Sequence, residues 1–239
     1  MPLSTKVRAL VISRKKIGEA DRLVTFFTKE HGLVRAIAKG VRKIPSSRGG
    51  HLELFTSVHV LLHESKAGSY VGAVETEEYF QALHADSDAL DRAKRAVYAL
   101  LKLFDVNQQL PEVFDAFTYA WQQFPTLSPE KRRLLESSLH LRMMQFAGLM
   151  PELHACAECG SQRPADTVIL SPKDGWWKCL LCHPLLPVSS HSLSARQFAI
   201  LKYIAAKPSD ASRIAAQEQE AIPVERAVHL LMAHAVVQS

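Results

Sequence analysis

All four cysteines of the chain lie between residues 156 and 182 and form two pairs with the spacing of metal ligands. Cys156 pairs with Cys159, Cys179 pairs with Cys182, and 19 residues separate the two pairs. Two residues between paired cysteines let one chain turn place two thiolates on one edge of a tetrahedron, and the second pair supplies the opposite edge. Gly160 follows the first pair, where a turn needs a positive φ. The spacing therefore predicts a site with four thiolate ligands, which is typical of Zn²⁺.

Three other chemistries use parts of the same pattern. Rubredoxin-like iron takes the same four ligands, and the sequence does not separate it from zinc. A thioredoxin-like dithiol needs one pair within a βαβ pattern, which surrounds neither pair here. The segment from Cys179 to His183 matches the CxxCH signature of c-type haem, but that assignment would leave the first pair unexplained and normally needs export. His154 and His183 flank the pairs and could at most support the ligands.

The predicted metal has a structural role. Four thiolates close the coordination shell of Zn²⁺ and leave no position for a reactive water. We therefore favour a staple for a small, loop-rich module over a zinc finger that reads nucleic acid. The chain also has no glycine-rich phosphate loop before Lys-Ser/Thr, no GxSxG and no paired acids with metal spacing, so we expect no enzymatic activity.

Basic residues are concentrated at the N-terminus. Residues 1–50 hold twelve Lys or Arg against three acids, a balance of +9, whereas residues 51–239 hold 17 basic and 21 acidic residues, a balance of −4. A basic module on a slightly acidic body predicts a polyanionic partner. The candidate DNA-binding residues are Arg8, Arg14, Lys15, Lys16, Arg35, Lys39, Arg42, Lys43 and Arg48.

Short runs of β-branched and apolar residues predict five strands in this basic region. The runs cover residues 7–13, 22–28, 33–38, 55–62 and 70–76. Five strands with mostly hairpin-length gaps predict a small barrel, a fold that presents an open face to single-stranded nucleic acid. The one long gap, residues 39–53, is rich in Gly, Ser and basic residues and predicts a mobile loop.

Aromatic residues that could stack on bases are few in the predicted barrel. They are Phe26, Phe27, Phe55 and Tyr70. Adjacent residues of a strand point to opposite faces, so at most one of Phe26 and Phe27 is available to a base. We therefore expect contacts with phosphate to dominate over base reading.

Beyond residue 80 the hydrophobic period changes to about 3.6, which predicts helices. Three amphipathic helices are expected after the capping cluster 86–88, from Pro111 and from Ser128, and they form a bundle. The third helix should turn inward Leu135, Leu139, Met143 and Phe146. The chain becomes helical again from Ser194, breaks at Pro208, and is expected to resume as a short helix near Pro223.

These patterns predict an α+β chain with four parts. They are a basic β-barrel (1–80), the first part of a helical domain (81–150), a four-cysteine zinc-binding module (151–190) and C-terminal helices that pack on the helical domain (191–239). No apolar run approaches the ~20 residues of a membrane span, and the first residues do not form a secretory signal. We therefore expect a soluble cytoplasmic protein without a membrane partner.

Several motifs occur in a characteristic order. Gly18–Phe26 forms a turn and strand, and His31–Lys43 contains an HG…AKGxR segment. Gly148-Leu149-Met150-Pro151-Glu152-Leu153 leads into the first cysteine pair, and Leu170-Ser171-Pro172 with Gly175 leads into the second. In this order the motifs resemble those of the RecO family along essentially the whole chain. One departure is Gly175-Trp176, where relatives often have Gly-Gly.

The resemblance implies an oligonucleotide-binding (OB-type) barrel, a helical domain and a zinc-binding insertion. It implies a non-catalytic recombination mediator at the nucleoid that binds single- and double-stranded DNA and anneals complementary strands. With RecR, such proteins help RecA to replace single-stranded-DNA-binding protein (SSB), whose acidic, apolar-ended tail they bind on the helical domain. Candidates for that contact, chosen by chemistry, lie near Leu135 and Leu139: Lys131, Arg132, Arg133 and Arg142.

Two functions of other classes stay open at this point. One is a zinc-stapled scaffold for protein partners without direct DNA binding, in which the basic residues serve only solubility. The other is an iron electron carrier. Binding of a labelled oligonucleotide at low salt separates the first from a DNA-binding protein, and the colour and metal content of the pure protein decide the second.

Overall fold

The computed structural model describes residues 4–42, 47–66, 68–162, 167–171, 176–182 and 191–238. The contacts between residues divide the chain into two compact units, each built from two segments. Unit 1 comprises Met1–Leu90 and Phe104–Gln122, and unit 2 comprises Asp91–Leu103 and Gln123–Ser239. Helix α2 (Ser87–Leu103) therefore begins in unit 1 and ends in unit 2.

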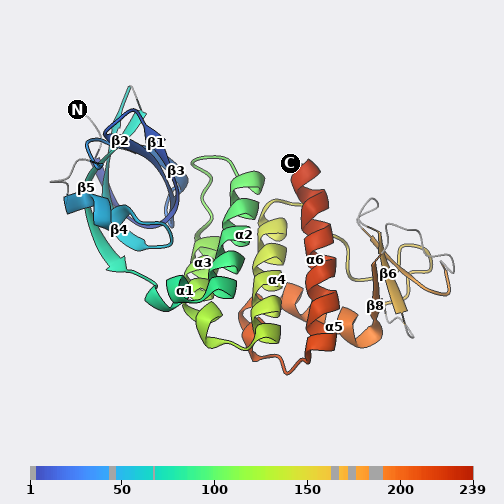
Figure 1. Ribbon diagram of the computed structural model, residues 1–239. Coiled ribbons are helices and arrows are strands. Elements are labelled where there is room, and N and C mark those ends of the chain that lie inside the picture. The colour runs from blue at the N-terminus through green and yellow to red at the C-terminus, as the bar shows by residue number, and fades with distance from the viewer. Residues whose placement is uncertain are drawn as a thin grey trace. The chain divides into compact units, whose positions relative to one another are not determined.

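Unit 1 contains a closed five-stranded barrel (Figure 1). Its strands are β1 (Ser4–Ile17), β2 (Asp21–Thr28), β3 (Gly32–Ala38), β4 (Ser57–Ser65) and β5 (Gly68–Glu78). They pair in the order β1-β2-β3-β5-β4; β3 and β5 run parallel, and the other neighbours are antiparallel. The predicted N-terminal five-stranded barrel is confirmed.

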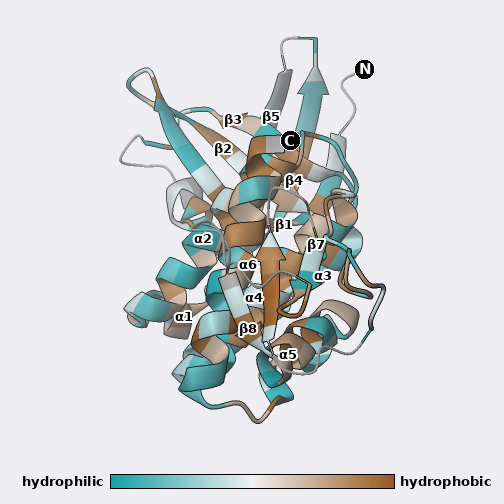
Figure 2. Cartoon of the chain, turned by 90° about the vertical axis from the view of Figure 1, so that its right-hand side faces the viewer, coloured by the Kyte–Doolittle hydropathy of each residue, from teal (hydrophilic) through white to brown (hydrophobic). Residues whose placement is uncertain are grey.

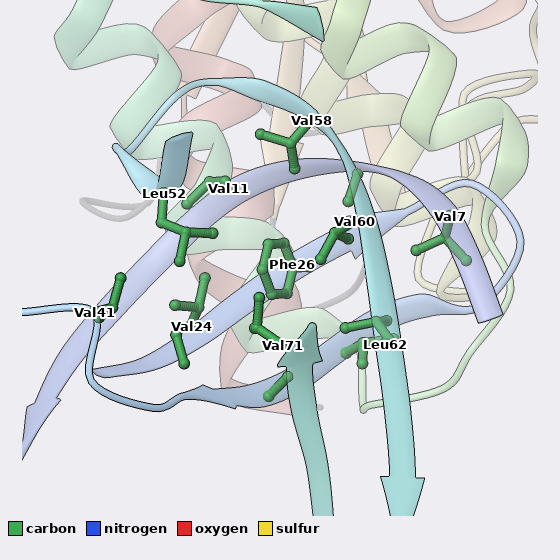
Figure 3. Close-up of a cluster of buried hydrophobic side chains, with 14 residues drawn as sticks. Val7, Val11, Val24, Phe26, Val41, Leu52, Val58, Val60, Leu62 and Val71 are labelled. Atoms are coloured by element: carbon green, nitrogen blue, oxygen red, sulfur yellow. The ribbon is translucent and has the colours of Figure 1, made fainter. Parts of the chain in front are cut away.

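The barrel core is built from alternate residues of the strands. Phe26 lies at the centre of fourteen buried side chains, most of which are valine or alanine (Figure 3). Phe27 points outward, and the rings of Phe114 and Phe117 in α3 (Pro111–Gln123) each lie 5.5 Å from its ring centroid. The two adjacent phenylalanines face opposite sides, as the alternation of a strand requires.

The long gap after β3 contributes to this core. Residues Ser47–Leu52 form a 3₁₀ helix, η1, and residues 43–46 lie outside the described residues. Val41 and Leu52, at the two ends of the segment, are 4% and 0% exposed and pack in the barrel core. The expected loop thus contains a short 3₁₀ helix and has one apolar residue near each end packed in the barrel core, while its mobility stays a prediction.

Two further helices belong wholly or largely to unit 1, namely α1 (Gln81–Ala85) and α3. The chain that leads to α3 runs close to β3, where the amide of Asn107 donates to the carbonyl of Leu33 at 2.9 Å. A Cβ atom at Gly32 would lie 1.7 Å from the carbonyl oxygen of Gln108, and Gly32 has a φ of +62°. Both features require glycine at this position.

Unit 2 combines helices with a small sheet. Its elements besides the end of α2 are η2 (Phe124–Thr126), α4 (Pro129–Phe146), β6 (Thr167–Ser171), β7 (Trp176–Cys179), β8 (His191–Ser194), α5 (Ala195–Ala206), η3 (Pro208–Arg213) and α6 (Glu218–Gln238). Helices α4 and α6 lie side by side (Figure 1). The sheet has the order β7-β6-β8. None of the described helices is long and apolar enough to cross a bilayer.

The last helix is longer than the sequence predicts. Helix α6 begins five residues before Pro223 and continues through it. Proline has no N–H to bond the carbonyl four residues earlier, which belongs to Gln219. The side-chain amide of Gln197 donates to that carbonyl at 3.1 Å. The prediction of a short helix that starts near Pro223 is wrong, because a side chain from α5 satisfies the group that proline leaves open.

Helix α4 is buried on nearly all sides rather than on one face. Leu135, Leu139 and Met143 are buried as predicted, but Glu136 and His140 are buried as well, at 0% and 3% exposure. Figure 2 shows that the neighbouring helix α6 also mixes hydrophilic and hydrophobic residues. The polar side chains inside unit 2 therefore need partners within the protein.

Candidate metal centre and nucleic-acid interface

The four cysteines of unit 2 come together in one cluster. Cys156 and Cys159 lie in a turn region, Cys179 is the last residue of β7, and Cys182 follows in the next turn. The Sγ atom of Cys179 lies 3.9 Å from that of Cys156, 3.8 Å from that of Cys159 and 3.3 Å from that of Cys182. Four sulfurs around a tetrahedral metal with bonds of about 2.3 Å would be about 3.8 Å apart. The four residues fit a metal ion.

Backbone hydrogen bonds give each pair the shape of a ligand turn. The amide of Gly160 donates to the carbonyl of Cys156 at 2.9 Å, and the amide of Cys182 donates to the carbonyl of Cys179 at 3.0 Å. Gly160 has a φ of +70°, as predicted from its place after the first pair. The amide of Ala157 donates to the carbonyl of Trp177 at 3.0 Å and so joins the first turn to β7.

The electrostatics of the cluster favour a bound cation. Burial alone would raise the pKa of Cys156, but backbone N–H groups of Cys159, Cys179 and Glu158 stabilise its thiolate and lower the pKa to about 6. Hydrogen bonds to the sulfurs of Cys179 and Cys159 raise the pKa of Cys182 to about 12. Four thiolates this close together would repel one another, so full deprotonation of the cluster would need a cation between them.

One aromatic contact anchors the cysteine module to the helices of unit 2. Trp177 of β7 is 0% exposed, and its ring centroid lies 4.8 Å from that of Phe198 in α5. Strand β8 runs directly into α5, where the Ser194 side chain accepts from the amide of Gln197. His154 is exposed, and His183 lies outside the described residues. A small sheet and one buried indole thus connect the metal cluster to the helical core.

A second group with metal-ligand chemistry lies in the same unit. Ligand atoms of Glu136, His140 and His229 lie within 4.8 Å of one another. The carboxylate of Glu136, however, already accepts hydrogen bonds from Arg92 at 2.6 Å and from Arg95 at 2.6 and 2.8 Å. Two guanidinium charges on the only anionic ligand oppose a further dication. We therefore assign this group to the structure of the helical core.

In unit 1, the strand pairing shows on which face of the barrel sheet each predicted basic residue lies. Lys15, Leu23, Ile37 and Tyr70 are paired in register and form one row across β1, β2, β3 and β5. Residues that are directly paired share a face, and neighbours along a strand point the other way. Because Val24 next to Leu23 is in the barrel core, this row points outward.

Two more cations lie beside this row. Arg35 is two residues before Ile37 and is paired with Thr25, and Lys39 lies in the turn after β3. Lys15, Arg35 and Lys39 are exposed, and the Nζ atom of Lys39 lies 4.5 Å from the centroid of the Tyr70 ring. We call this surface the outer face; it consists of Lys15, Leu23, Thr25, Arg35, Ile37, Lys39 and Tyr70.

The other candidates on β1 lie elsewhere. Arg14 forms an ion pair with Glu53, whose carboxylate also lies 3.9 Å from Arg22. Lys16 is exposed but pairs with Arg22, in a row that alternates with the outer face. Arg8 forms an ion pair with Glu77 at 2.6 Å, and its guanidinium lies 5.7 Å from the Phe114 ring centroid. Arg8 and Arg14 thus have local partners within unit 1.

The last three candidates follow β3. Arg42 is exposed and its Nη1 atom donates to the carbonyl of Gly18 at 3.2 Å. Lys43 lies outside the described residues, as does the side chain of Arg48, whose backbone belongs to η1. The roles of these residues stay predictions.

Burial limits which of the four aromatic residues named from the sequence can reach a base. Phe26, Phe27 and Phe55 are all at most 5% exposed. Tyr70 is only partly buried and belongs to the outer face. The sequence shows that Tyr70 could stack on a base but does not show that it lies near the cations, because this proximity depends on the parallel pairing of β5 with β3.

The basic residues of α4 occupy different environments. Arg132 donates to the carbonyls of Leu127 and Pro125 at 2.8 and 3.2 Å, and Arg133 forms an ion pair with Glu225. The guanidinium of Arg142 lies 5.0 Å from the Phe146 ring centroid, and Lys131 is partly buried. Leu135 and Leu139, the apolar part of the predicted contact, are buried, with 3% and 2% exposure.

Comparison with known proteins gives consistent matches. Residues 1–80 match the family model Recombination protein O N terminal, and residues 84–235 match Recombination protein O C terminal. A DNA repair protein RecO of Desulfitobacterium hafniense is 35% identical over 175 residues, which cover 73% of this chain and 63% of the relative. For DNA repair protein RecO of Thermobifida fusca the identity is 33% over 183 residues, or 73% and 72% of the two chains. For that of Dehalococcoides mccartyi it is 28% over 209 residues, or 85% and 79%.

The matches agree with the architecture. The alignment with the Desulfitobacterium relative spans less than two thirds of that protein's length. The first family model contains all five barrel strands, and the second contains the cysteine cluster and the helices of unit 2 except the last three residues of α6. This chain belongs to the RecO family.

Proposed function

We propose that the chain is a DNA-binding recombination mediator that acts in DNA repair, binds single- and double-stranded DNA and anneals complementary strands. The observation that carries the proposal is the outer face, on which Lys15, Arg35 and Lys39 surround a partly exposed row of Leu23, Ile37 and Tyr70. Cations beside apolar and aromatic side chains are what single-stranded nucleic acid requires, since phosphates and bases must both be contacted. The names of the relatives support a role in DNA repair.

Under this proposal the cations of the outer face bind phosphates without reading sequence. Lysine and arginine that contact phosphates release counterions, so that affinity falls as salt rises. Neither Arg8 nor Arg14 is required, because each guanidinium already faces a carboxylate of the barrel unit. The proposed phosphate contacts are therefore assigned first to Lys15, Arg35 and Lys39, and the roles of the other candidates stay predictions.

Neutralising the outer face should flatten the salt dependence of DNA binding. We expect the triple variant Lys15→Gln, Arg35→Gln, Lys39→Gln to reduce the slope of log K against log salt by about 2 for single strands, because each lost phosphate contact removes about 0.7. Fluorescence anisotropy with a labelled oligonucleotide at several salt concentrations measures the slope.

The matched control removes the same charge from three exposed lysines that are not on the outer face: Lys94, Lys102 and Lys207. The control triple variant should keep the wild-type slope. Equal slopes for both triple variants would show that net charge rather than the outer face governs binding. Absence of binding by the wild type at low salt would favour the scaffold function instead.

We further propose that the cysteine cluster holds Zn²⁺ in a structural role. Cys156, Cys159, Cys179 and Cys182 would supply all four ligands, and a closed thiolate shell gives the ion no position for substrate or water. We accordingly propose that the chain is not an enzyme. Iron is the alternative ion, and the metal content of the purified protein separates the two.

The partners proposed from family membership are RecR, RecA and the acidic tail of SSB, in the bacterial cytoplasm at the nucleoid. Unit 2 has a hollow of about 500 Å³ whose lining combines apolar side chains with Arg196, Arg213 and Asp210. Arg213 lies 3.5 Å from Asp210, and Arg196 forms an ion pair with Glu220. Ile200, Tyr203 and Ile214 line the same hollow. The two arginines remain 69% and 80% exposed beside their carboxylate partners, so they can contact an acidic, apolar-ended peptide at this hollow, whereas Leu135 and Leu139 of α4 are buried.

Annealing on SSB-coated DNA tests this set of proposals. Wild-type protein should anneal complementary strands, whether they are naked or coated with SSB. Together with RecR it should also allow RecA to form filaments on SSB-coated single strands. Arg213→Glu should slow annealing of SSB-coated strands severalfold and leave naked strands unaffected, because it repels an acidic tail.

The control is Arg142→Glu, which places the same charge on α4. If Arg142→Glu and not Arg213→Glu slows annealing on coated strands, the tail binds to α4, as the sequence predicts. Slower annealing of naked strands by either variant would point to a defect in DNA binding or folding.

A further inference from the structure

We propose that Tyr70 is the base-stacking residue of the outer face and that Tyr70 and Lys39 together bind one nucleotide of single-stranded DNA. The inference rests on the proposed function and specifies the ligand at that site as an unpaired nucleotide. Tyr70 would stack on the base, and the Lys39 ammonium would bind a phosphate beside it.

The position of Tyr70 follows from the strand register. Its partners across the sheet are Ile37 on β3 and His63 on β4, so its side chain has a strand on each side. Its neighbour Val71 is 5% exposed and belongs to the barrel core, which directs Tyr70 outward. An aromatic ring fixed on a sheet in this way is the usual platform for a base.

The other aromatic side chains of the barrel strands, and Phe55 and Tyr79 beside them, are less suitable. Phe26, Phe27 and Phe55 are buried. Tyr79 is 48% exposed, but its ring stacks on His84 at 4.5 Å with an interplanar angle of 6°. Tyr79 is also remote from the cations of the outer face in the strand pairing, since it follows the end of β5. Tyr70 therefore combines partial exposure with neighbouring cations.

Lys39 has the geometry for the second half of the site. Its ammonium lies over the Tyr70 ring at 4.5 Å from the centroid, at an exposed position in a turn. A cation–π contact at an exposed site contributes little free energy, whereas the interaction of a lysine with a phosphate contributes more. The flexible lysine side chain can therefore move from the ring to a phosphate, and the same movement uncovers the ring for a base.

The ligand class follows from the stacking itself. In a duplex each base is stacked between its neighbours and is not available to the ring, whereas a base in a single strand is. The Tyr70 ring should thus contribute to binding of single strands and not of duplexes, while Lys39 contributes to both.

Replacement of Tyr70 by leucine provides the test. We expect Tyr70→Leu to weaken single-stranded DNA binding about tenfold, since stacking on one aromatic ring is of that order, and to change duplex binding less than about twofold. Tyr70→Phe should bind as the wild type does, because it keeps the ring. Tyr79→Leu is the matched control and should leave both affinities unchanged.

An oligonucleotide with abasic sites separates stacking from phosphate contact. Wild type should bind it about tenfold more weakly than the normal strand, and Tyr70→Leu should bind the two strands equally. Lys39→Gln should lower the salt slope and retain the preference for bases. If Tyr70→Leu binds normal single strands as the wild type does, or loses duplex binding equally, the stacking role is wrong while DNA binding stands. If the wild type binds neither strand at low salt, the proposed function itself fails.

Discussion

Replacing Cys159 with serine is expected to release the metal ion and to unfold the cysteine module of unit 2. A serine hydroxyl does not replace a thiolate ligand, and the three remaining sulfurs cannot close a tetrahedral shell. In small metal-binding domains the metal contributes on the order of 10 kcal/mol to folding. Metal content per chain should therefore fall from one ion to nearly none, and thermal unfolding should show an early transition that the wild type lacks.

The chain offers a control within the second cysteine pair. Leu181 lies between Cys179 and Cys182 and is 87% exposed, so Leu181→Ser should change neither metal content nor the melting curve. Stoichiometric metal and an unchanged melting curve in Cys159→Ser would mean that the ligand set is wrong. Treating the wild type with a chelator should have the same effect as the Cys159→Ser substitution. The chelator should cause no further change in the variant.

The size of this effect follows from how little else holds the module. The described part of its sheet consists of β6, β7 and β8, of five, four and four residues. Besides Cys179, its buried apolar side chains are few: Val168, Ile169, Leu170, Leu193 and Trp177, the last packed on Phe198. Such a sheet buries too little apolar surface to offset the entropy of ordering the chain. The barrel of unit 1 has its own core and does not depend on the metal in this way.

The sequence predicts those features that depend on local spacing. Alternation along β2 shows that Phe26 and Phe27 face opposite sides, and the two cysteine pairs indicate one cluster; the structure confirms both. Helix starts at Pro111 and Ser194 are likewise local, since capping and proline effects act within one turn.

Features that depend on pairing between distant segments could not be predicted. Lys15 and Arg14 are adjacent basic residues that the sequence does not distinguish. In the structure, however, Lys15 lies on the outer face and Arg14 pairs with Glu53. The distinction depends on the register of β1 with β2 and on the return of η1 to the barrel. Tyr70 joins the site only through the parallel pairing of β5 with β3. Side-chain partners across a fold are set by topology, which a single sequence does not specify.

The buried charges of unit 2 are the largest feature that the sequence did not indicate. Arg92, 3% exposed, donates to Glu136 at 2.6 Å and to Glu225 at 2.7 Å. Arg95 holds both oxygens of Glu136, and Arg133 pairs with Glu225. Burial would raise the pKa of Glu136, but the hydrogen bond from Arg95 and other nearby positive groups hold it far below its usual value. Glu136 therefore stays ionised at neutral pH.

Replacing Arg92 with methionine is expected to destabilise unit 2 by about 3–5 kcal/mol, because removal of one partner leaves buried carboxylates with too few donors. Chemical denaturation measures the free energy of unfolding. Lys94→Met is the matched control, since Lys94 pairs with Asp91 at 2.8 Å on the surface, where both side chains are more than half exposed. An exposed pair contributes at most about 1 kcal/mol. Similar losses in the two variants would mean that the buried network adds no more than a surface pair.

A double-mutant cycle separates the pairing from the cost of a missing side chain. Glu136→Gln alone leaves Arg92 and Arg95 without their shared carboxylate and should also be strongly destabilising. In the double variant with Arg92→Met, one buried charge of each sign has been removed, so the combined loss should be smaller than the sum of the two single losses. Arg92, Glu136 and Glu225 lie on α2, α4 and α6, which are far apart in sequence. Because the Arg92 guanidinium also contacts Glu225 on α6, the coupling between Arg92 and Glu136 measures the link between α2 and α4 alone, and a second cycle with Glu225→Gln measures the link between α2 and α6.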